Sequence, residues 1–248
     1  MKKIISILVM TLFCFAIQTS MQAQVAVGSV PGQFGVSPGG AATYSLPIEC
    51  PVGINGMQPN ISLYYNSQAG NGIAGWGWNI SGLSAITRTK STVYYDGADT
   101  GVKWDNTSPY ALDGQRLFIT RQCQSDSVEY RTENESYSRI VGYSIQSWGP
   151  QYFRVYPKSG GVMTYGNTQS LASYAPVYSN AATDALTGTN YERMGWNLVE
   201  VQDNNGNYVS FEYATSVNSY AGNVIKNITY GNNKNKATST NIVVTFNY

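Results

Sequence analysis

Carboxylate and lysine side chains are the groups left for catalysis in this chain, because the 248-residue sequence contains no histidine. This absence removes Ser-His-Asp and Cys-His nucleophiles and the usual zinc sites. A glycosidase needs two carboxylates about 5 to 10 Å apart across a cleft. The candidates are Asp96, Asp99, Asp105, Asp113, Glu129 and Glu200. Since the first three lie in a polar loop and Asp113 in a turn, where Asp is favoured for backbone hydrogen bonds, we expect no enzymatic activity.

A second candidate site is the pattern Gly70-x-Gly72-x-x-Gly75, which matches dinucleotide-binding loops and has Asp96 near the distance expected for a ribose contact. The pattern holds a pyrophosphate only where a strand precedes it and a helix begins at its end. Residues 77–82 contain two further glycines, an asparagine and a serine, which is poor helix material. The sequence therefore predicts a tight β-corner and no cofactor.

Two tryptophans lie in this glycine-rich segment, Trp76 and Trp78. Tryptophan fills the space beside close backbone approaches. We therefore expect both to be structural, with at least one largely buried against a strand at residues 61–65.

The segment Asp203–Asn207 has the oxygen-rich composition of a calcium loop, but no bidentate glutamate stands at the twelfth position. It is predicted to be a hairpin turn. No metal site is expected.

Tyrosines provide the alternative to a structural function, because exposed aromatic rings stack on sugars. Tyr64, Tyr65, Tyr94 and Tyr95 are the candidates for a secreted adhesin or carbohydrate-binding β-domain. Adjacent residues of a strand face opposite sides, so at most one of each pair is expected to be exposed.

The N-terminus has the composition of a secretory signal: Lys2 and Lys3 precede an apolar run at residues 4–17, and small or polar residues lead to Ala23. The run is shorter than the roughly 20 residues of a membrane span. We expect a signal peptide at residues 1–23, export without a membrane anchor, and one β-domain at residues 24–248.

The charge composition gives no indication of an electrostatic partner, since 15 Lys and Arg residues are nearly balanced by 14 Asp and Glu residues, and charged residues are only 12% of the chain. No nucleic-acid surface is expected. Cys14 leaves with the signal, whereas Cys50 and Cys123 form one disulfide or stay as separate buried thiols.

Short alternating segments separated by turn residues predict an all-β fold, an antiparallel β-sandwich or an irregular β-roll. An Asp113-Gly114 turn followed by an apolar run is the strongest hairpin signal. Only residues 169–190 are compatible with a short helix, and a loop is favoured there. Strands are predicted at residues 41–48, 61–65, 84–88, 91–95, 115–119, 128–131, 140–146, 152–156, 162–165, 196–201, 208–213, 224–230 and 241–248.

The last predicted strand runs to Tyr248, and an alternating strand in that position presents an unpaired edge. We therefore expect the sequence to be a fragment or a short product of something longer.

The chain resembles the SpvB-type N-terminal domain of insecticidal toxin-complex B components and Rhs/YD-repeat proteins. The resemblance is carried by residues 35–44, 51–59, 63–67, 70–83, 112–117 and 196–213 in the family's order, and it weakens at residues 122–140. The motif residues, expected to be core and turn residues, are Gly40, Tyr44, Asn66, Ser67, Gly70, Gly72, Gly75, Trp76, Gly77, Trp78, Leu83, Asp113, Gly114, Gln115, Arg116, Leu117, Trp196, Asp203, Gly206 and Asn207.

The resemblance implies a non-enzymatic structural and interaction module that contributes to a hollow β-shell around a toxic polypeptide. Its expected partner is the remaining Rhs/YD-repeat or toxin-complex polypeptide. The ADP-ribosyltransferase of some relatives matches no segment here.

Overall fold

The structure is a computed structural model that describes residues 31–123, 126–166, 177–179, 191–217, 220–236 and 241–248. The expected signal peptide and Cys14 lie outside the described residues. All elements below belong to one unit, Gly32–Tyr248.

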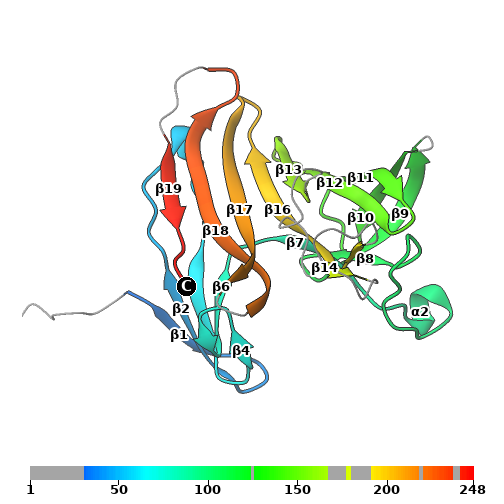
Figure 1. Ribbon diagram of the computed structural model, residues 1–248, viewed down its shortest axis with the longest axis horizontal. Helices are drawn as coiled ribbons and strands as arrows, with labels where there is room; N and C mark the ends of the chain where they lie inside the picture. Colours follow the sequence, from blue (N-terminus) through cyan, green and yellow to red (C-terminus); the bar gives the residue numbers. More distant parts are fainter. Residues whose placement is uncertain (1–30, 124–125, 167–176, 180–190, 218–219, 237–240) are drawn as a thin grey trace, which may run out of the picture. The chain divides into compact units, whose positions relative to one another are not determined.

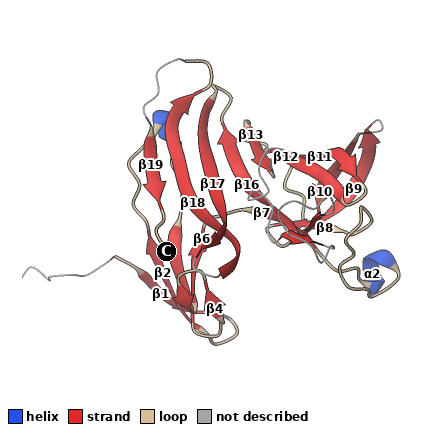
Figure 2. Cartoon of the chain, viewed as in Figure 1, coloured by secondary structure: helices blue, strands red, loops and turns tan. Residues whose placement is uncertain are grey.

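Strands form nearly all of the regular structure (Figure 2), which confirms the all-β prediction. The strands are β1 (Gln33–Val36), β2 (Ala42–Pro47), β3 (Ser62–Asn66), β4 (Asn71–Gly72), β5 (Gly75–Trp76), β6 (Trp78–Ser81), β7 (Ala85–Arg88), β8 (Tyr110–Leu112), β9 (Gln115–Cys123), β10 (Ser127–Thr132), β11 (Arg139–Gln146), β12 (Gly149–Tyr156), β13 (Val162–Tyr165), β14 (Val177–Ser179), β15 (Tyr191–Arg193), β16 (Gly195–Gln202), β17 (Asn207–Val217), β18 (Tyr220–Asn233) and β19 (Ile242–Thr245). In the described part of the chain two short helical turns accompany them, η1 (Ile54–Gly56) and α2 (Val93–Asp96). Among the described residues, no helix has the length and apolar character needed to span a membrane.

A four-stranded antiparallel sheet has the order β1-β2-β3-β6. Residues directly opposite one another share a face of the sheet. The register aligns one aromatic side chain from each strand: Phe34, Tyr44, Tyr65 and Trp78. The adjacent row, on the other face, is Ser45, Tyr64 and Asn79. The sheet therefore has one strongly apolar face and one more polar face.

The second sheet contains a closed ring of eight antiparallel strands. β13 pairs with β12 on one side and with β16 on the other, so the order β13-β12-β11-β10-β9-β8-β7-β16 returns to its start. β16 pairs with β7 through Gly195–Asn197 and with β17 through Glu200–Gln202. β17, β18 and β19 therefore continue from β16 outside the ring (Figure 1).

Aromatic side chains from four strands of the ring form the centre of its core. Tyr110, Phe153 and Trp196 meet edge to face, with ring centroids 5.1 to 5.4 Å apart. Tyr130 joins them 5.9 Å from Tyr110. The indole N–H of Trp196 donates to the Pro150 carbonyl at 2.9 Å, so its polar atom is satisfied although the side chain is fully buried.

One predicted strand is wrong. The segment at residues 91–95 contains α2, not a strand. The Thr92 side chain accepts a hydrogen bond from the Tyr95 amide, and Gly97 ends the turn in the left-handed conformation at φ 71°. Capping at both ends therefore outweighs the strand preference of its valine and tyrosines.

Two further segments differ from the predictions. β1 was not predicted, since the glycines and proline around it indicate a loop. Most of residues 169–190 lies outside the described part, but Val177–Ser179 within it is a strand, β14, paired with β15.

Candidate functional site

The glycine-rich segment folds as three short strands, β4, β5 and β6. A strand, not a helix, begins at Gly75, so the geometry that holds a dinucleotide pyrophosphate is not formed there. The Gly77 amide donates to the Gly70 carbonyl at 2.8 Å. Gly77 has φ 77°, and a Cβ atom there would lie 2.6 Å from the Tyr65 ring, so glycine is required by both backbone and space. Gly72 is equally confined, since its Cβ would lie 2.1 Å from the Trp78 carbonyl oxygen.

The two tryptophans of this segment have different environments. Trp78 is half-buried and packs on Tyr65, with ring centroids 5.2 Å apart, and on Tyr44 at 6.4 Å. Trp76 is 71% exposed on the β4–β5 hairpin. The expectation that Trp76 is a packing residue is therefore corrected: its side chain points to solvent because, among the described strands, β5 pairs only with the two-residue β4.

The motif residues that flank this segment shape the turn between β1 and β2, the turn after β3, and the core contact after β6. Gly40 has φ 81° in the turn. The Ser67 Oγ accepts from the Ala42 amide at 2.9 Å, and the Asn66 Oδ1 accepts from the Gln68 amide at 2.9 Å. Leu83 is partly buried against the hydrophobic core. Their roles in the structure are turn formation and packing.

The Asp113-Gly114 turn joins β8 to β9 and also fixes the start of β7. Asp113 and Gly114 both have positive φ, 48° and 82°. The Asp113 carboxylate accepts hydrogen bonds from the Ala85 amide at 2.9 Å and from the Ser84 hydroxyl at 2.7 Å. Gln115 pairs with Leu112 across the hairpin. Leu117, two residues later, lies in the core.

The Asp203–Asn207 segment is the hairpin turn between β16 and β17, with Gly206 at φ 84°. The Asp203 carboxylate accepts from the amides of Asn205 and Asn207 at 2.8 and 2.9 Å, and from the Asn207 side chain at 2.7 Å. It also accepts from the Asn55 side chain at 3.1 Å. Burial opposes ionisation, but these hydrogen bonds outweigh it and lower the Asp203 pKa. The carboxylate is thus occupied by the turn itself.

The other candidate carboxylates each have a partner of their own. Their partners are Arg116 for Asp96, Lys90 for Asp99, Thr107 for Asp105, Arg121 and Arg139 for Glu129, and Lys234 for Glu200. Within the described part of the chain, no group of three or more Cys, Asp or Glu side chains is placed to hold a metal ion. The structure therefore assembles no pair of free carboxylates from the six predicted candidates.

The candidate tyrosines for sugar binding lie in two different places. Tyr64 and Tyr65 are half-buried on opposite faces of β3. Tyr94 and Tyr95 are both exposed, at 86% and 42%, so the expectation that at most one of the pair is exposed is wrong here, because a helical turn and not a strand carries them. Tyr95 is the less exposed of the two, since it lies edge-on to Phe118 with ring centroids 5.0 Å apart. The Tyr95 hydroxyl donates to the Glu133 carboxylate, and that hydrogen bond raises its pKa.

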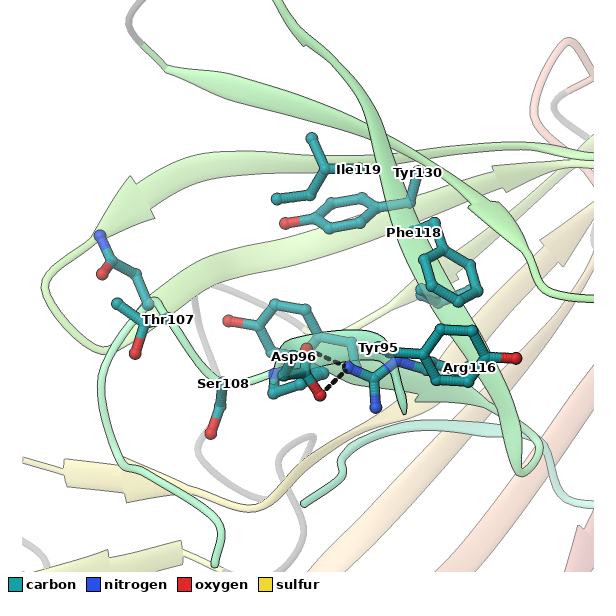
Figure 3. Close-up of a pocket in the computed structure, with 12 residues that line it drawn as sticks. Tyr95, Asp96, Thr107, Ser108, Arg116, Phe118, Ile119 and Tyr130 are labelled. Atoms are coloured by element: carbon teal, nitrogen blue, oxygen red, sulfur yellow. Dashed lines mark hydrogen bonds and ion pairs between the residues drawn. The ribbon is translucent and has the colours of Figure 1, made fainter. Parts of the chain in front are cut away.

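Tyr95 and Asp96 border a cavity of about 260 Å³, here called the α2–β9 pocket (Figure 3). β8 pairs with β9 only as far as Arg116, so beyond that residue the β8-facing side of β9 has no described strand beside it, and the pocket lies there. Its walls come from α2, from the loop at residues 106–109, and from the strands β8, β9 and β10. The lining residues are Tyr95, Asp96, Asn106, Thr107, Ser108, Pro109, Tyr110, Arg116, Leu117, Phe118, Ile119 and Tyr130.

Four lining residues, Tyr95, Asp96, Arg116 and Leu117, are among those singled out in the sequence, whereas Tyr110 and Tyr130 are not. Burial raises the pKa of both phenols, that of Tyr110 to about 12, with the nearby Arg88 opposing the shift. Arg88 is itself buried and donates to backbone carbonyls, at 2.6 Å to Arg193 and 2.7 Å to Asp105. None of these residues forms a motif, so no sequence signal identifies them.

Cys50 is a free, partly buried thiol that packs against the hydrophobic core, and burial raises its pKa. Of the two alternatives for the cysteines, the structure therefore favours the unpaired thiol at Cys50.

Known proteins share this fold and its sequence pattern. The sequence model of the family described as Salmonella virulence plasmid 65kDa B protein, SpvB, matches residues 36–248. No curated protein sequence matches the chain. The crystal structure of TcdB2-TccC3 is similar with a TM-score of 0.62 and 20% identity, covering 83% of this chain and 10% of that one.

Two further structures show the same likeness. The Photorhabdus luminescens Tc holotoxin pore has a TM-score of 0.58 and 21% identity, covering 87% of this chain and 11% of that one. The N-terminal domain of effector protein SpvB from Salmonella typhimurium strain LT2 has a TM-score of 0.56 and 18% identity, covering 80% of this chain and 70% of that one. The chain thus spans about a tenth of the toxin-complex chains that it matches. Because the family model matches nearly all of the described residues, the chain belongs to the SpvB family.

Proposed function

We propose that this chain is a non-enzymatic structural and interaction module of a secreted Rhs- or toxin-complex-like protein, in which it contributes to a β-shell that encloses a toxic polypeptide. The observation that carries the proposal is the fold shared with TcdB2-TccC3, together with membership of the SpvB family. Since the chain corresponds to 10% of the TcdB2-TccC3 chain, it would act as one part of a larger assembly.

The state of the carboxylates supports a non-enzymatic role. Each of the six candidates is held by an ion pair or by turn hydrogen bonds, and none faces a second free carboxylate. A general acid and a nucleophile or base must both be available at one cleft. Export is supported by the signal-like residues 1–23.

Association through strand edges is the mode of interaction that we propose. β19 is the last strand of its sheet and pairs only with β18 among the described strands. Its residues alternate between half-buried and exposed, and Val243 is an exposed apolar residue on it. A free edge of this kind can accept a strand from another polypeptide through main-chain hydrogen bonds.

The test is to co-produce the chain with the Rhs/YD-repeat polypeptide encoded in its own genome, either as a separate chain or as a continuation of this one. We expect the two to form one assembly and the melting temperature of this domain to rise. Val243→Lys should weaken the assembly, because a lysine on an edge strand opposes pairing, whereas the control Val52→Lys alters an exposed residue outside every sheet. A monodisperse chain that gains neither a partner nor stability would contradict the proposal.

A further inference from the structure

We propose that the α2–β9 pocket binds a neutral hydroxylated ring, a sugar unit. This inference is separate from the proposed shell function, because it rests only on the lining of one cavity.

The charges of the pocket are already compensated. Asp96 and Arg116 are the charged residues among those that line it, and they form an ion pair with two contacts of 2.7 Å. The pair is shielded, since the Arg116 side chain is 11% exposed and the Asp96 side chain 28%. A charged ligand could form an ion pair here only by displacing Asp96 from Arg116 or Arg116 from Asp96. The displaced side chain would then be left without a counter-charge in a shielded place, which is unfavourable. The electrostatics therefore favour a neutral ligand.

Two polar groups of the pocket have no partner among the described residues. Tyr130 is only 5% exposed, and its hydroxyl makes no hydrogen bond to any of these residues, but the hydroxyl oxygen itself remains accessible from the cavity. In Figure 3 the Tyr130 ring lies beside Ile119, its cross-strand neighbour, with its hydroxyl end over the pocket. Asn106, an exposed residue of the loop before β8, also lines the pocket, and its carboxamide makes no hydrogen bond within the described chain. Both groups are open to the cavity and can exchange hydrogen bonds with a ligand there, so the pocket suits a polar occupant.

The type of polar occupant follows from the hydrogen bonds that these two groups can donate and accept. A phenol hydroxyl and a carboxamide each donate and accept hydrogen bonds. Alcohol hydroxyls do the same, so they match both groups at once. An apolar side chain from a protein partner would fill the volume but leave Tyr130 and Asn106 unpaired.

The remaining walls suit the carbon face of a sugar ring. Leu117, Phe118 and Ile119 supply apolar surface along β9, and Pro109 of the loop before β8 also lines the pocket. Exposed Tyr94 projects from α2, the helical turn that also carries the lining residue Tyr95. Pockets with mostly apolar walls and a few placed polar groups are typical of small-molecule sites, and this one is of a size for a single ring.

The test is saturation-transfer NMR of the chain with methyl glycosides of glucose, galactose, mannose, fucose, N-acetylglucosamine and N-acetylgalactosamine. Each is used at about 10 mM, well above a Kd of about 1 mM. We expect at least one glycoside to bind, and Tyr130→Phe, which removes only the hydroxyl, to weaken it about fivefold or more. Asn106→Ala should also weaken binding, whereas Tyr137→Phe, at an exposed tyrosine outside the pocket, should not.

Thermal melting of each variant verifies that it is folded. The proposal is overturned if no glycoside binds, or if Tyr130→Phe and Tyr137→Phe bind alike. It is also overturned if a co-purifying polypeptide, and no glycoside, loses its binding on Tyr130→Phe, because the pocket would then be a protein contact.

Discussion

Arg116 holds Asp96 through both carboxylate oxygens, each 2.7 Å from Nη2. The same carboxylate accepts from the Thr92 amide at 2.7 Å, so one side chain ties both ends of α2 to β9. The Arg116 guanidinium lies 5.1 Å from the Tyr95 ring centre and 5.8 Å from that of Phe118. A helical turn of only four residues is thereby fastened to the outside of the ring.

We expect Asp96→Asn to lower the free energy of unfolding by about 2 kcal/mol, because it leaves the shielded guanidinium of Arg116 without a counter-charge. Urea unfolding at pH 7 measures the loss. The matched control is Asp99→Asn, whose partner Lys90 is exposed, as is Asp99 itself, and which should cost less than about 0.5 kcal/mol. Equal losses for the two variants would show that burial does not strengthen the Asp96 pair.

The two tryptophans Trp196 and Trp76 should behave oppositely when truncated. Trp196→Ala removes a fully buried ring at the centre of the core and should cost about 3 to 5 kcal/mol, enough to unfold a marginal domain. Trp76→Ala removes an exposed side chain and should change stability by less than about 0.5 kcal/mol. Thermal and urea unfolding compare them with the parent. A large loss at Trp76 would contradict its exposure and show that the ring packs against other residues of the folded chain.

Local signals explain which parts of the fold could be predicted from sequence. The Asp113-Gly114 hairpin depends on two residues that tolerate positive φ, and adjacent residues display that signal. The strands whose residues alternate between more and less buried positions, such as β7 and β19, are found near their predicted positions for the same reason. By contrast, α2 depends on Arg116, twenty residues from Asp96, and no local pattern reports that contact.

The ring closure and the pocket depend entirely on distant residues. β13 pairs with β16, which lies about 30 residues later in the sequence. The alternation of apolar and polar residues within each strand does not show which distant strand it pairs with. The pocket brings together Asp96, Asn106, Arg116 and Tyr130 because β8 is short and leaves part of β9 uncovered. Strand length and register decide this, and both are poorly specified by single residues.

The Asp113 turn should be sensitive to the hydrogen-bonding atoms of its side chain. Asp113→Ala loses the bonds to Ser84 and Ala85 and should lower stability by about 1 to 2 kcal/mol. Asp113→Asn keeps an acceptor and tolerates positive φ, so it should cost less. Unfolding curves measure the order. Equal losses for the two variants would show that the charge of Asp113, not its hydrogen-bond acceptors, fixes β7.

Acid stability should depend on Asp203. Its pKa in the folded chain is lowered by hydrogen bonds from Asn207, Asn55 and Asn205, which outweigh the opposing effect of burial. A lowered folded-state pKa stabilises the fold above the unfolded value of about 4, and this stabilisation is lost as pH falls through the folded value. Asp203→Asn should therefore show a smaller difference in unfolding free energy between pH 7 and pH 3 than the parent. An unchanged difference would place the acid sensitivity elsewhere, for example at Glu212, whose pKa is also lowered by hydrogen bonds from Lys226 and Asn227.

Alkaline stability should depend on the buried phenols of the ring. Burial raises the pKa of Tyr110 to about 12, although the nearby Arg88 opposes the shift. Because the folded-state value exceeds the unfolded value of about 10, the stabilisation is complete below pH 10 and is lost as pH rises toward 12. Each such tyrosine contributes a slope of at most about 1.4 kcal/mol per pH unit in that window.

Tyr110→Phe should therefore flatten the fall in unfolding free energy between pH 10 and about 12, whereas Tyr94→Phe, at an exposed position, should leave it unchanged. Urea unfolding at several pH values measures the slope, and absorbance of tyrosinate shows when ionisation occurs. We expect ionisation of the buried tyrosines to coincide with unfolding, since the core admits no charged phenolate. Tyrosinate that forms at Tyr110 in the folded chain at pH 10 would contradict this, and would mean that Arg88 stabilises the phenolate more than burial disfavours it.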